Sequence, residues 1–296
     1  MASILDELES ELDELNSSLW IKENDIYRPS TNLKILTELE PGVYTVDYDR
    51  DLGYFCKKLP PISDELFLFS NSIISELLSE IDLFWEKKDL FKENKLIHKR
   101  GILLTGFPGT GKSSIVTQIS QGIIDKEGVV FIIQNLRNLD FYFGFLKVGF
   151  RRIQPDTPLV TIIEDIEKYV EVETELLDFL DGKSSIEHHI VISTSNNTDD
   201  LPDSLLRSSR FDIQIEVELP DERVRREYFT HKNVPSELLD ELVERSDECS
   251  LADLKEIYVC IFLLEYSIKE AFEKVLNPKE RKNYLFKGSS SKKIGL

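Results

Sequence analysis

The stretch GFPGTGKSS at residues 106–114 restricts the possible folds of this chain more than any other part of its sequence. It comes directly after RGILLTG at residues 100–106, a short apolar run of the kind that forms a buried parallel strand. The stretch fits the spacing G-x-x-x-x-G-K-S, whose glycines allow a tight loop between a strand and a helix. The sequence therefore predicts a strand–loop–helix unit at this position.

Such a loop directs its backbone N–H groups at phosphate oxygens, and the helix that follows adds a partial positive charge. We expect Lys112 to pair with the β- and γ-phosphates, and the hydroxyl of Ser113 to bind Mg²⁺. The sequence therefore predicts a site for ATP and Mg²⁺. The residues expected to contact the nucleotide are Gly106, Pro108, Gly109, Thr110, Gly111, Lys112, Ser113 and Ser114.

Further short apolar runs alternate with helical patterns along the middle of the chain. This alternation predicts an α/β fold, with a P-loop core built on a parallel sheet that helices cover on both faces. After Pro220 the strand patterns end and only helical patterns follow, which predicts a small all-helical lid domain. The further runs are VVFII (129–133), LVTII (159–163), HIVIST (189–194) and IQIEVE (213–218).

The first part of the chain shows two further patterns. Leucines at heptad spacing in an acidic segment predict an amphipathic helix. This helix either packs on its own chain or frays in solvent, or else it docks a partner or a neighbouring subunit. Alternating apolar and polar residues at 43–58 predict a β-hairpin. The expected regions are 1–22 for the helix, 23–63 for a small region with the hairpin, 64–219 for the nucleotide-binding core, 220–284 for the helical lid and 285–296 for a flexible tail.

Charge and cysteine content limit the partners and the compartment. The formal net charge of −19 repels polyanions, which argues against nucleic acid as a partner. Three cysteines without CxxC spacing argue against a disulfide framework or a zinc site and fit a reducing cytoplasm. Because no run of 18 apolar residues occurs, we expect no membrane span, and the acidic N-terminus is not typical of a signal peptide.

Polar residues follow two of the predicted strands. In TIIEDIE (161–167), Glu164 and Asp165 stand at the end of a buried strand, where a Mg²⁺–ATP site needs carboxylates. Asn196 ends the next strand and is placed to hold a water between these acids and the γ-phosphate. Arg207 and Arg210 follow three residues apart; a salt-bridge pair at a helix end would explain them if they stood alone.

Together these stretches resemble the AAA branch of the AAA+ ATPases over roughly residues 65–275. The resemblance implies a homo-oligomeric ring, typically a hexamer, that uses ATP hydrolysis to do work on a protein partner. It assigns Asn196 the role called sensor 1, and it makes Arg207 and Arg210 arginine fingers for the ATP of the neighbouring subunit. SLADLKEI (250–257) is similar to the lid helix that closes on the nucleotide, with Ser250 in place of the usual glycine.

The order of Glu164 and Asp165 is the reverse of the order usual in this family. It resembles a subgroup that contains the translocase of the Rieske iron–sulfur protein together with soluble bacterial and phage relatives. By position, we expect Glu164 in the metal shell and Asp165 as the group that polarises water. The translocase carries a transmembrane segment that we do not expect here, so its substrate is not carried over.

FYFGF at 141–145 has two interpretations. Tyr142, Phe143 and Gly144 fit the aromatic–hydrophobic–glycine pattern of the pore loops of AAA unfoldases, a role that requires an exposed Tyr142. Apolar residues also recur at near-helical spacing between 141 and 150, which predicts a helix that buries an aromatic face.

The main functional prediction is a cytoplasmic ATPase that converts ATP and water to ADP and phosphate and remodels, disassembles or translocates a protein. One alternative is a nucleic-acid-associated ATPase of the loader type, which the net charge opposes. The other is a nucleotide-gated binding protein with slow hydrolysis, because the aspartate at position 165 is one methylene shorter than the usual glutamate.

Overall fold

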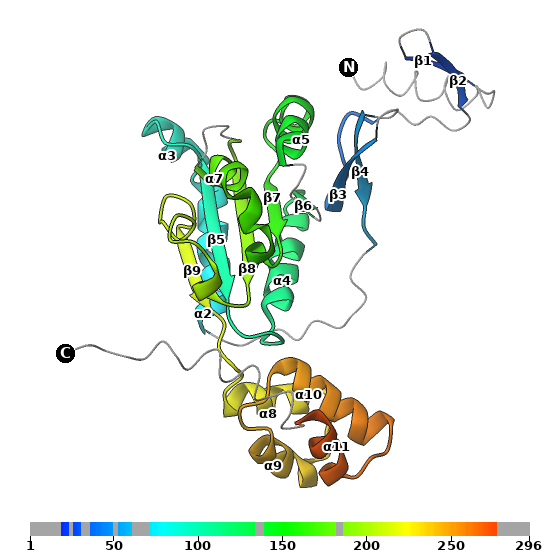
Figure 1. The fold of residues 1–296 in the computed structure, drawn as a ribbon, viewed down its shortest axis with the longest axis vertical. Coiled ribbons are helices and arrows are strands. Elements are labelled where there is room, and N and C mark those ends of the chain that lie inside the picture. Colours follow the sequence, from blue (N-terminus) through cyan, green and yellow to red (C-terminus); the bar gives the residue numbers. More distant parts are fainter. Residues whose placement is uncertain are drawn as a thin grey trace. The chain divides into compact units, whose positions relative to one another are not determined.

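The computed structural model describes residues 19–23, 26–30, 36–49, 53–60, 72–133, 139–181 and 186–276. Its central element is a seven-stranded sheet with the order β4-β3-β6-β7-β8-β5-β9 (Figure 1). Neighbouring strands pair in parallel except β3 and β4, which are antiparallel. The strands are β3 (Gly42–Asp49), β4 (Gly53–Lys58), β5 (Lys99–Thr105), β6 (Val129–Ile133), β7 (Leu159–Ile163), β8 (His189–Ser195) and β9 (Ile213–Glu216).

The apolar runs of the sequence form the middle of this sheet. Every residue of β7 and β8 is buried, because helices cover both faces of these strands. The edge strand β9 instead alternates between half-buried and exposed residues. A parallel strand without a solvent face requires apolar residues at successive positions, which explains the continuous runs. The predicted α/β fold with a mostly parallel sheet is confirmed.

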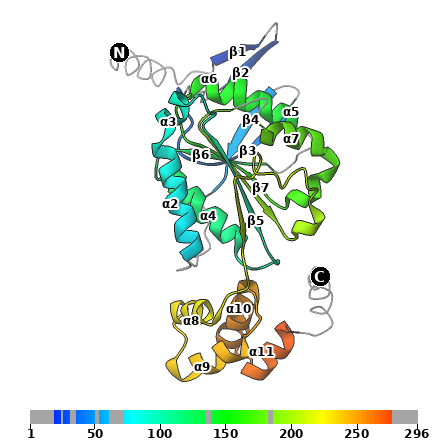
Figure 2. The same ribbon diagram turned by 90° about the vertical axis from the view of Figure 1, so that its left-hand side faces the viewer.

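Helices α2 (Ser72–Glu86) and α4 (Lys112–Ile124) lie on one side of the sheet, as Figure 2 shows. Their apolar side chains form one buried cluster with alternate residues of the central strands. The short helix α3 (Lys88–Glu93) follows α2 after a break at Lys87. The strand residues in this cluster are Ile102, Leu104, Val130, Val160, Ile162, Ile190 and Ile192.

The other side of the sheet is covered by α5 (Leu139–Gly144), the π-helical turn Phe145–Phe150, the short α6 (Arg151–Ile153) and α7 (Glu173–Asp181). The strand residues that alternate with those of the first cluster point to this other face of the sheet and contact these helices. Phe131 of β6 packs edge-on against rings of this layer, and Thr161 of β7 hydrogen-bonds to α5. Each strand therefore contributes alternate side chains to two separate layers of packing.

The predicted hairpin at 43–58 is present as β3 and β4. The sequence assigned it to a small region outside the core, but β3 pairs in parallel with β6 and extends the central sheet. Tyr44 of β3 is buried and packs near Phe131 of β6. The hairpin therefore protects the edge of β6. The alternating sequence pattern predicts the hairpin itself but carries no signal for the long-range pairing of β3 with β6.

Beyond Pro220 the described residues form helices. They are α8 (Glu222–His231), α9 (Ser236–Arg245), α10 (Leu251–Tyr258), a π-helical turn (Val259–Leu263) and α11 (Ile268–Val275). Their apolar faces form a second cluster around Phe229, Leu242 and Leu254, separate from the cluster of the sheet. Ser250 and Ser267 begin α10 and α11 with capping boxes, which define where these two helices start.

The part of the chain before Glu40 is a separate unit that contains an antiparallel pair, β1 (Leu19–Glu23) and β2 (Ile26–Ser30). The helix predicted for 1–22 lies mostly outside the described residues. Its last positions, from Leu19, belong instead to β1, where pairing with β2 provides hydrogen-bond partners for the backbone N–H and C=O groups. The tail predicted for 285–296 also lies outside the described residues. Within the described ranges, no helix combines the length and apolar character needed to cross a membrane.

Candidate functional site

The residues predicted to bind and hydrolyse the nucleotide within one subunit lie at one edge of the sheet. β7, β8 and β5 are neighbours in the sheet and run in parallel, so their carboxyl ends lie side by side. The phosphate loop follows β5, Glu164 and Asp165 follow β7, and Asn196 follows β8. The carboxyl edge of a parallel sheet is where α/β proteins commonly bind ligands.

The phosphate loop depends on its glycines. Gly106, Gly109 and Gly111 have φ values of +142°, +82° and +103°, a region that other residues seldom adopt. A Cβ atom at Gly106 would also lie 2.3 Å from the carbonyl oxygen of Val217. The sequence spacing therefore reflects backbone geometry that only glycine adopts at low cost.

Helix α4 begins at Lys112 with no capping side chain and no acidic residue in its first turn. The N–H groups at the start of a helix lack intrahelical partners, so this end can receive an anion. The side chain of Thr110 is buried and donates to the carbonyl of Phe107 at 2.9 Å, which stabilises the loop. Pro108 and Ser113 are exposed and Ser114 is half-buried, at the entrance to this end.

Lys112 and Asn196 connect the phosphate loop with the acidic edge. The Lys112 Nζ atom donates to the carbonyls of Gly106 at 2.7 Å and Phe107 at 3.0 Å, and to Asn196 Oδ1 at 3.0 Å. Burial lowers the pKa of the Lys112 ammonium, whereas the carboxylates of Asp165 and Glu167 act in the opposite direction. This ammonium is thus a partly desolvated cation beside the loop, where it would attract an anion strongly.

The two predicted acids are placed differently. Asp165 has a φ of +50°, and its N–H donates to Thr194 Oγ1 at 3.0 Å. Its Oδ1 accepts from Asn196 Nδ2 at 3.1 Å, and its Oδ2 pairs with Lys168. The side chain of Glu164 is exposed. The structure therefore brings Asp165, Asn196 and Lys112 together and leaves Glu164 at the surface of the same edge.

Glu167 is a site residue that the sequence analysis did not identify. It lies on the 3-10 helix Ile166–Val172, and its Oε1 accepts from both the N–H and the Nδ2 of Asn196, each at 3.1 Å. The signal was present as the third acid of IIEDIE. Only the tight turn after Asp165, however, returns that acid to the end of β8.

The two predicted finger arginines have different environments. Arg210 is buried and forms a bidentate ion pair with Asp181, with both N–O distances at 2.7 Å. It also donates to the carbonyl of Ser204. Its assignment as a finger is corrected, because its guanidinium is held inside its own subunit. The side chain of Arg207 is exposed and keeps that assignment as a prediction.

The pore-loop interpretation of Tyr142, Phe143 and Gly144 is wrong in its structural premise. All three residues lie in or at the end of α5, and Tyr142 is only 5% exposed. Its hydroxyl is 2.8 Å from Thr161 Oγ1, and burial raises its pKa. The ring of Phe143 packs on Phe179 at 4.5 Å. The alternative interpretation, a helix with a buried aromatic face, describes this segment.

Helix α10 contacts the phosphate loop. The N–H of Ala252 donates to the carbonyl of Gly109 at 3.2 Å. A Cβ atom at Gly109 would lie 2.8 Å from Ser250 Oγ and 2.9 Å from the Ala252 Cβ. The first turn of α10 therefore packs directly against the exposed tip of the loop.

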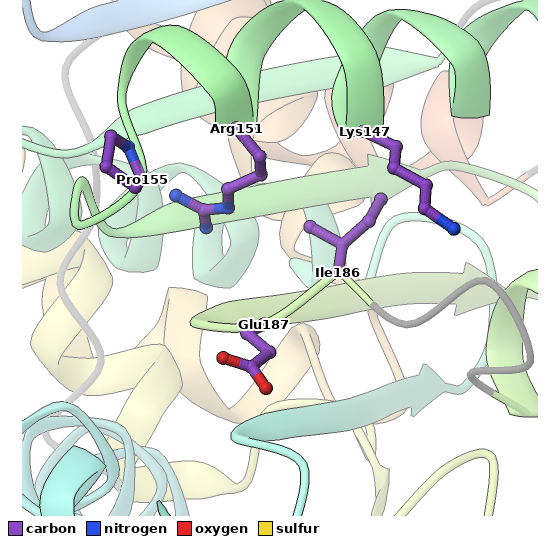
Figure 3. Close-up of a pocket in the computed structure, with 5 residues that line it drawn as sticks. All are labelled: Lys147, Arg151, Pro155, Ile186 and Glu187. Carbon is purple, nitrogen blue, oxygen red and sulfur yellow. The ribbon is translucent and has the colours of Figure 1, made fainter.

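A separate pocket of about 240 Å³ lies away from these residues (Figure 3). It is lined by Lys147, Arg151, Pro155, Ile186 and Glu187, from segments that precede β7 and β8. It is therefore near the amino edge of the sheet, opposite the phosphate loop. It contains none of the predicted site residues.

The residues at the carboxyl edge fit a nucleotide with Mg²⁺. The uncapped start of α4 and the Lys112 ammonium suit phosphate groups, and the exposed residues Ser113 and Glu164 supply oxygen atoms at the same edge of the sheet. Mg²⁺ commonly takes one or two protein oxygens together with phosphates and water, so this small donor set is sufficient.

Comparisons with known proteins agree with this geometry. The family described as "ATPase family associated with various cellular activities (AAA)" matches residues 102–219. A proteasome-activating nucleotidase of Saccharolobus islandicus is 30% identical over 279 residues, which cover 84% of this chain and 66% of that protein. A proteasome-associated ATPase of Thermomonospora curvata is 27% identical over 213 residues, which cover 60% of this chain and 36% of that protein. The chain thus spans between about a third and two thirds of these relatives.

Proposed function

Because the chain belongs to the AAA+ superfamily of ATPases, we propose that it binds ATP with Mg²⁺ and hydrolyses it to ADP and phosphate. The observation that carries this proposal is the continuous contact from Lys112 through Asn196 to Asp165. It joins the phosphate-binding side of the site to the acidic side at the edge where three parallel strands end. Neither a lone phosphate loop nor a lone acidic strand end would explain this link.

Each residue has a separate task in this proposal. Lys112 and the loop N–H groups hold the phosphates, and Ser113 and Glu164 hold Mg²⁺, which neutralises charge on the phosphates when bound. Asp165 accepts a proton from, or orients, the attacking water. Asn196 fixes that water between Asp165 and the phosphate side, since it already contacts both Asp165 and Lys112.

We propose further that the subunits assemble into a homo-oligomeric ring, typically a hexamer, in which Arg207 serves the neighbouring site. The carbonyl of Arg210 packs against Gly101, and the N–H of Arg210 bonds to the carbonyl of Arg207. Gly101 lies about 16 Å along β5 from the phosphate loop, at roughly 3.3 Å per residue. Arg207 therefore lies well away from the phosphate loop of its own subunit, as an arginine finger acting in trans requires.

The proposed substrate is a protein that the ring remodels or translocates. The names of the relatives, a proteasome-activating nucleotidase and a proteasome-associated ATPase, support a protein-directed role. The net charge of −19 opposes nucleic acid. Cys56, Cys249 and Cys260 are not in disulfide bonds, which suits the reducing cytoplasm in which we place this activity.

Two finer assignments belong to this proposal. The Glu164–Asp165 order favours the subgroup that resembles the Rieske-protein translocase, whereas the relatives reported above are associated with proteasomes. The contact between Ala252 and Gly109 supports a lid role for helices α8 to α11, which would respond to nucleotide in the loop.

A second candidate is a nucleotide-gated binding protein that hydrolyses ATP slowly. It is favoured by the engagement of both carboxylate oxygens of Asp165, one with Asn196 and the other with Lys168. A water that reacts at this site must displace or share one of these partners. Steady-state turnover distinguishes the candidates, because a slow binder remains far below the usual range of about 1–10³ per second.

The test compares ATP binding and hydrolysis in wild type, Lys112→Ala and Asp165→Asn. We expect Lys112→Ala to lose tight ATP binding, because no other side chain supplies a cation inside the described loop. We expect Asp165→Asn to retain binding without hydrolysis. Lys126→Ala is the control, since this exposed lysine follows the far end of α4 and pairs with Asp82. ATP binding by Lys112→Ala within a few-fold of wild type would overturn the phosphate-loop assignment.

A further inference from the structure

Glu167 contacts Asn196 through two hydrogen bonds to a single oxygen. Its Oε1 accepts the backbone N–H of Asn196 and one hydrogen of Nδ2, each at 3.1 Å. One bond fixes the backbone where β8 ends, and the other fixes the side chain that leaves it. Hydrogen bonds to an ionised acceptor are stronger than neutral ones, so this pair defines the position of Asn196.

These contacts also determine the orientation of the Asn196 amide. Its Nδ2 lies between Asp165 Oδ1 and Glu167 Oε1, whereas its Oδ1 accepts from Lys112 Nζ. The reverse orientation would place the amide oxygen against two carboxylates and the NH₂ group against an ammonium. The surrounding charges therefore permit one orientation only.

The second oxygen of Glu167 is an independent observation. Within the described part of the chain, Oε2 is buried and has no hydrogen-bond partner. An unpaired buried acceptor reduces stability, so such atoms call for an explanation other than folding. At the edge of a nucleotide site, a water enclosed together with the ligand would supply the missing donor.

We propose that Glu167 is a positioning residue of the ATPase site, which holds Asn196 so that its amide can orient the attacking water. This inference rests on the proposed ATPase function. Glu167 does not need to contact the nucleotide, because it acts through Asn196. Its variants should therefore lower turnover more than they weaken ATP binding.

A double-mutant cycle tests this role. We expect Glu167→Ala to lower kcat by roughly 10²-fold, the scale of a misplaced catalytic group, with the Kd for ATP within a few-fold. In an Asn196→Ala background the same substitution should change kcat less than about twofold, because its target is gone. Glu167→Gln retains an acceptor oxygen and should turn over at least about tenfold faster than Glu167→Ala. Equal losses in both backgrounds, or no gain with glutamine, would overturn the proposal.

Hydrogen exchange gives a second readout that does not need activity. The N–H of Asn196 should lose its protection in Glu167→Ala, while the N–H of Ile192 in the middle of β8 stays protected. Glu187→Ala, which removes an exposed acid just before β8, is the control and should change neither turnover nor this exchange. If wild type does not hydrolyse ATP, the proposed function fails, and the Asn196 exchange alone decides the role of Glu167. Unchanged protection of the Asn196 N–H in Glu167→Ala would then overturn the proposed role of Glu167.

Discussion

At the residue scale, Glu164 and Asp165 are neighbours with different surroundings. Asp165 turns toward Asn196, whereas the side chain of Glu164 is exposed. We predict that Asp165→Asn retains ATP binding and loses hydrolysis, because its amide cannot accept a proton from water. Glu164→Gln should instead raise the Mg²⁺ concentration needed for half-maximal turnover. Mg²⁺ titrations of both variants measure these effects, and an exchange of the two phenotypes would reverse the assigned roles.

Tyr142 is a second residue whose surroundings determine the expected result. Its buried ring packs near Phe131 and Phe179, and its hydroxyl meets Thr161. We predict that Tyr142→Phe costs about 1 kcal/mol for the lost hydrogen bond. Tyr142→Ala should cost about 3–5 kcal/mol for the cavity. At about 2–4 °C per kcal/mol, thermal melts resolve both changes.

The control for Tyr142 is Leu90→Ala on α3, where the side chain is 49% exposed. This substitution should change stability by less than about 0.5 kcal/mol, as is usual at the surface. A melting temperature of Tyr142→Ala equal to that of wild type would contradict the buried position and restore the pore-loop interpretation.

At the scale of secondary structure elements, two glycines near α4 give opposite predictions for one chemical change. Gly109 has a φ of +82° and lies against Ser250, so Gly109→Ala should strain the loop and separate it from α10. Gly122 lies inside α4 with nothing within 4 Å of an added Cβ. Gly122→Ala should therefore stabilise the protein by up to about 1 kcal/mol.

The melting temperature and the ATP affinity of the two glycine variants test these predictions. We expect Gly109→Ala to lower both, because strained backbone at a residue with φ above zero costs about 1–2 kcal/mol before the contact with Ser250 is counted. Gly122→Ala should raise the melting temperature and leave ATP affinity unchanged. A stable Gly109→Ala protein with normal ATP affinity would show that the packing of α10 on the loop is dispensable.

The elements differ in how far the sequence determines them. The strands β5 to β8 and the phosphate loop were predictable, because burial on both faces and positive φ values select residue types locally. The pairing of β3 with β6 was not predictable, since the order of strands in a sheet depends on contacts between residues distant in sequence. For the same reason, the role of Glu167 was missed and Arg210 was wrongly assigned as an arginine finger. Their roles depend on Asn196 and Asp181, each 29 residues away along the chain.

The connection from β8 to β9 carries two arginines that should respond differently to truncation. Arg210→Ala removes one partner of a largely buried ion pair with Asp181 and should cost about 3 kcal/mol of stability. Arg207→Ala removes an exposed side chain and should leave the melting temperature unchanged. Its turnover should nevertheless fall by about 10³-fold or more if it acts as an arginine finger. Melts and ATPase rates separate the two, and normal turnover in Arg207→Ala would exclude the finger role.

At the scale of the whole molecule, the proposed ring separates a subunit's catalytic groups between two sites. In this proposal Lys112, Asp165 and Asn196 serve the subunit's own ATP, whereas Arg207 lies near the amino end of β5, away from those residues. Each active site is then complete only at an interface. Activity should accordingly depend on protein concentration in the range where the ring assembles.

Mixing two inactive variants tests this division directly. An Arg207→Ala subunit retains an intact site, and an Asp165→Asn subunit retains an intact finger, so some interfaces of a mixed ring combine both. With equal amounts and random order, about a quarter of the interfaces are productive, and ATPase activity should recover to about a quarter of the wild-type rate if they act independently. A mixture of Asp165→Asn with Lys112→Ala is the control and should not recover, because neither subunit has an intact site. Absence of recovery in rings shown to contain both variants would mean that Arg207 acts within its own subunit.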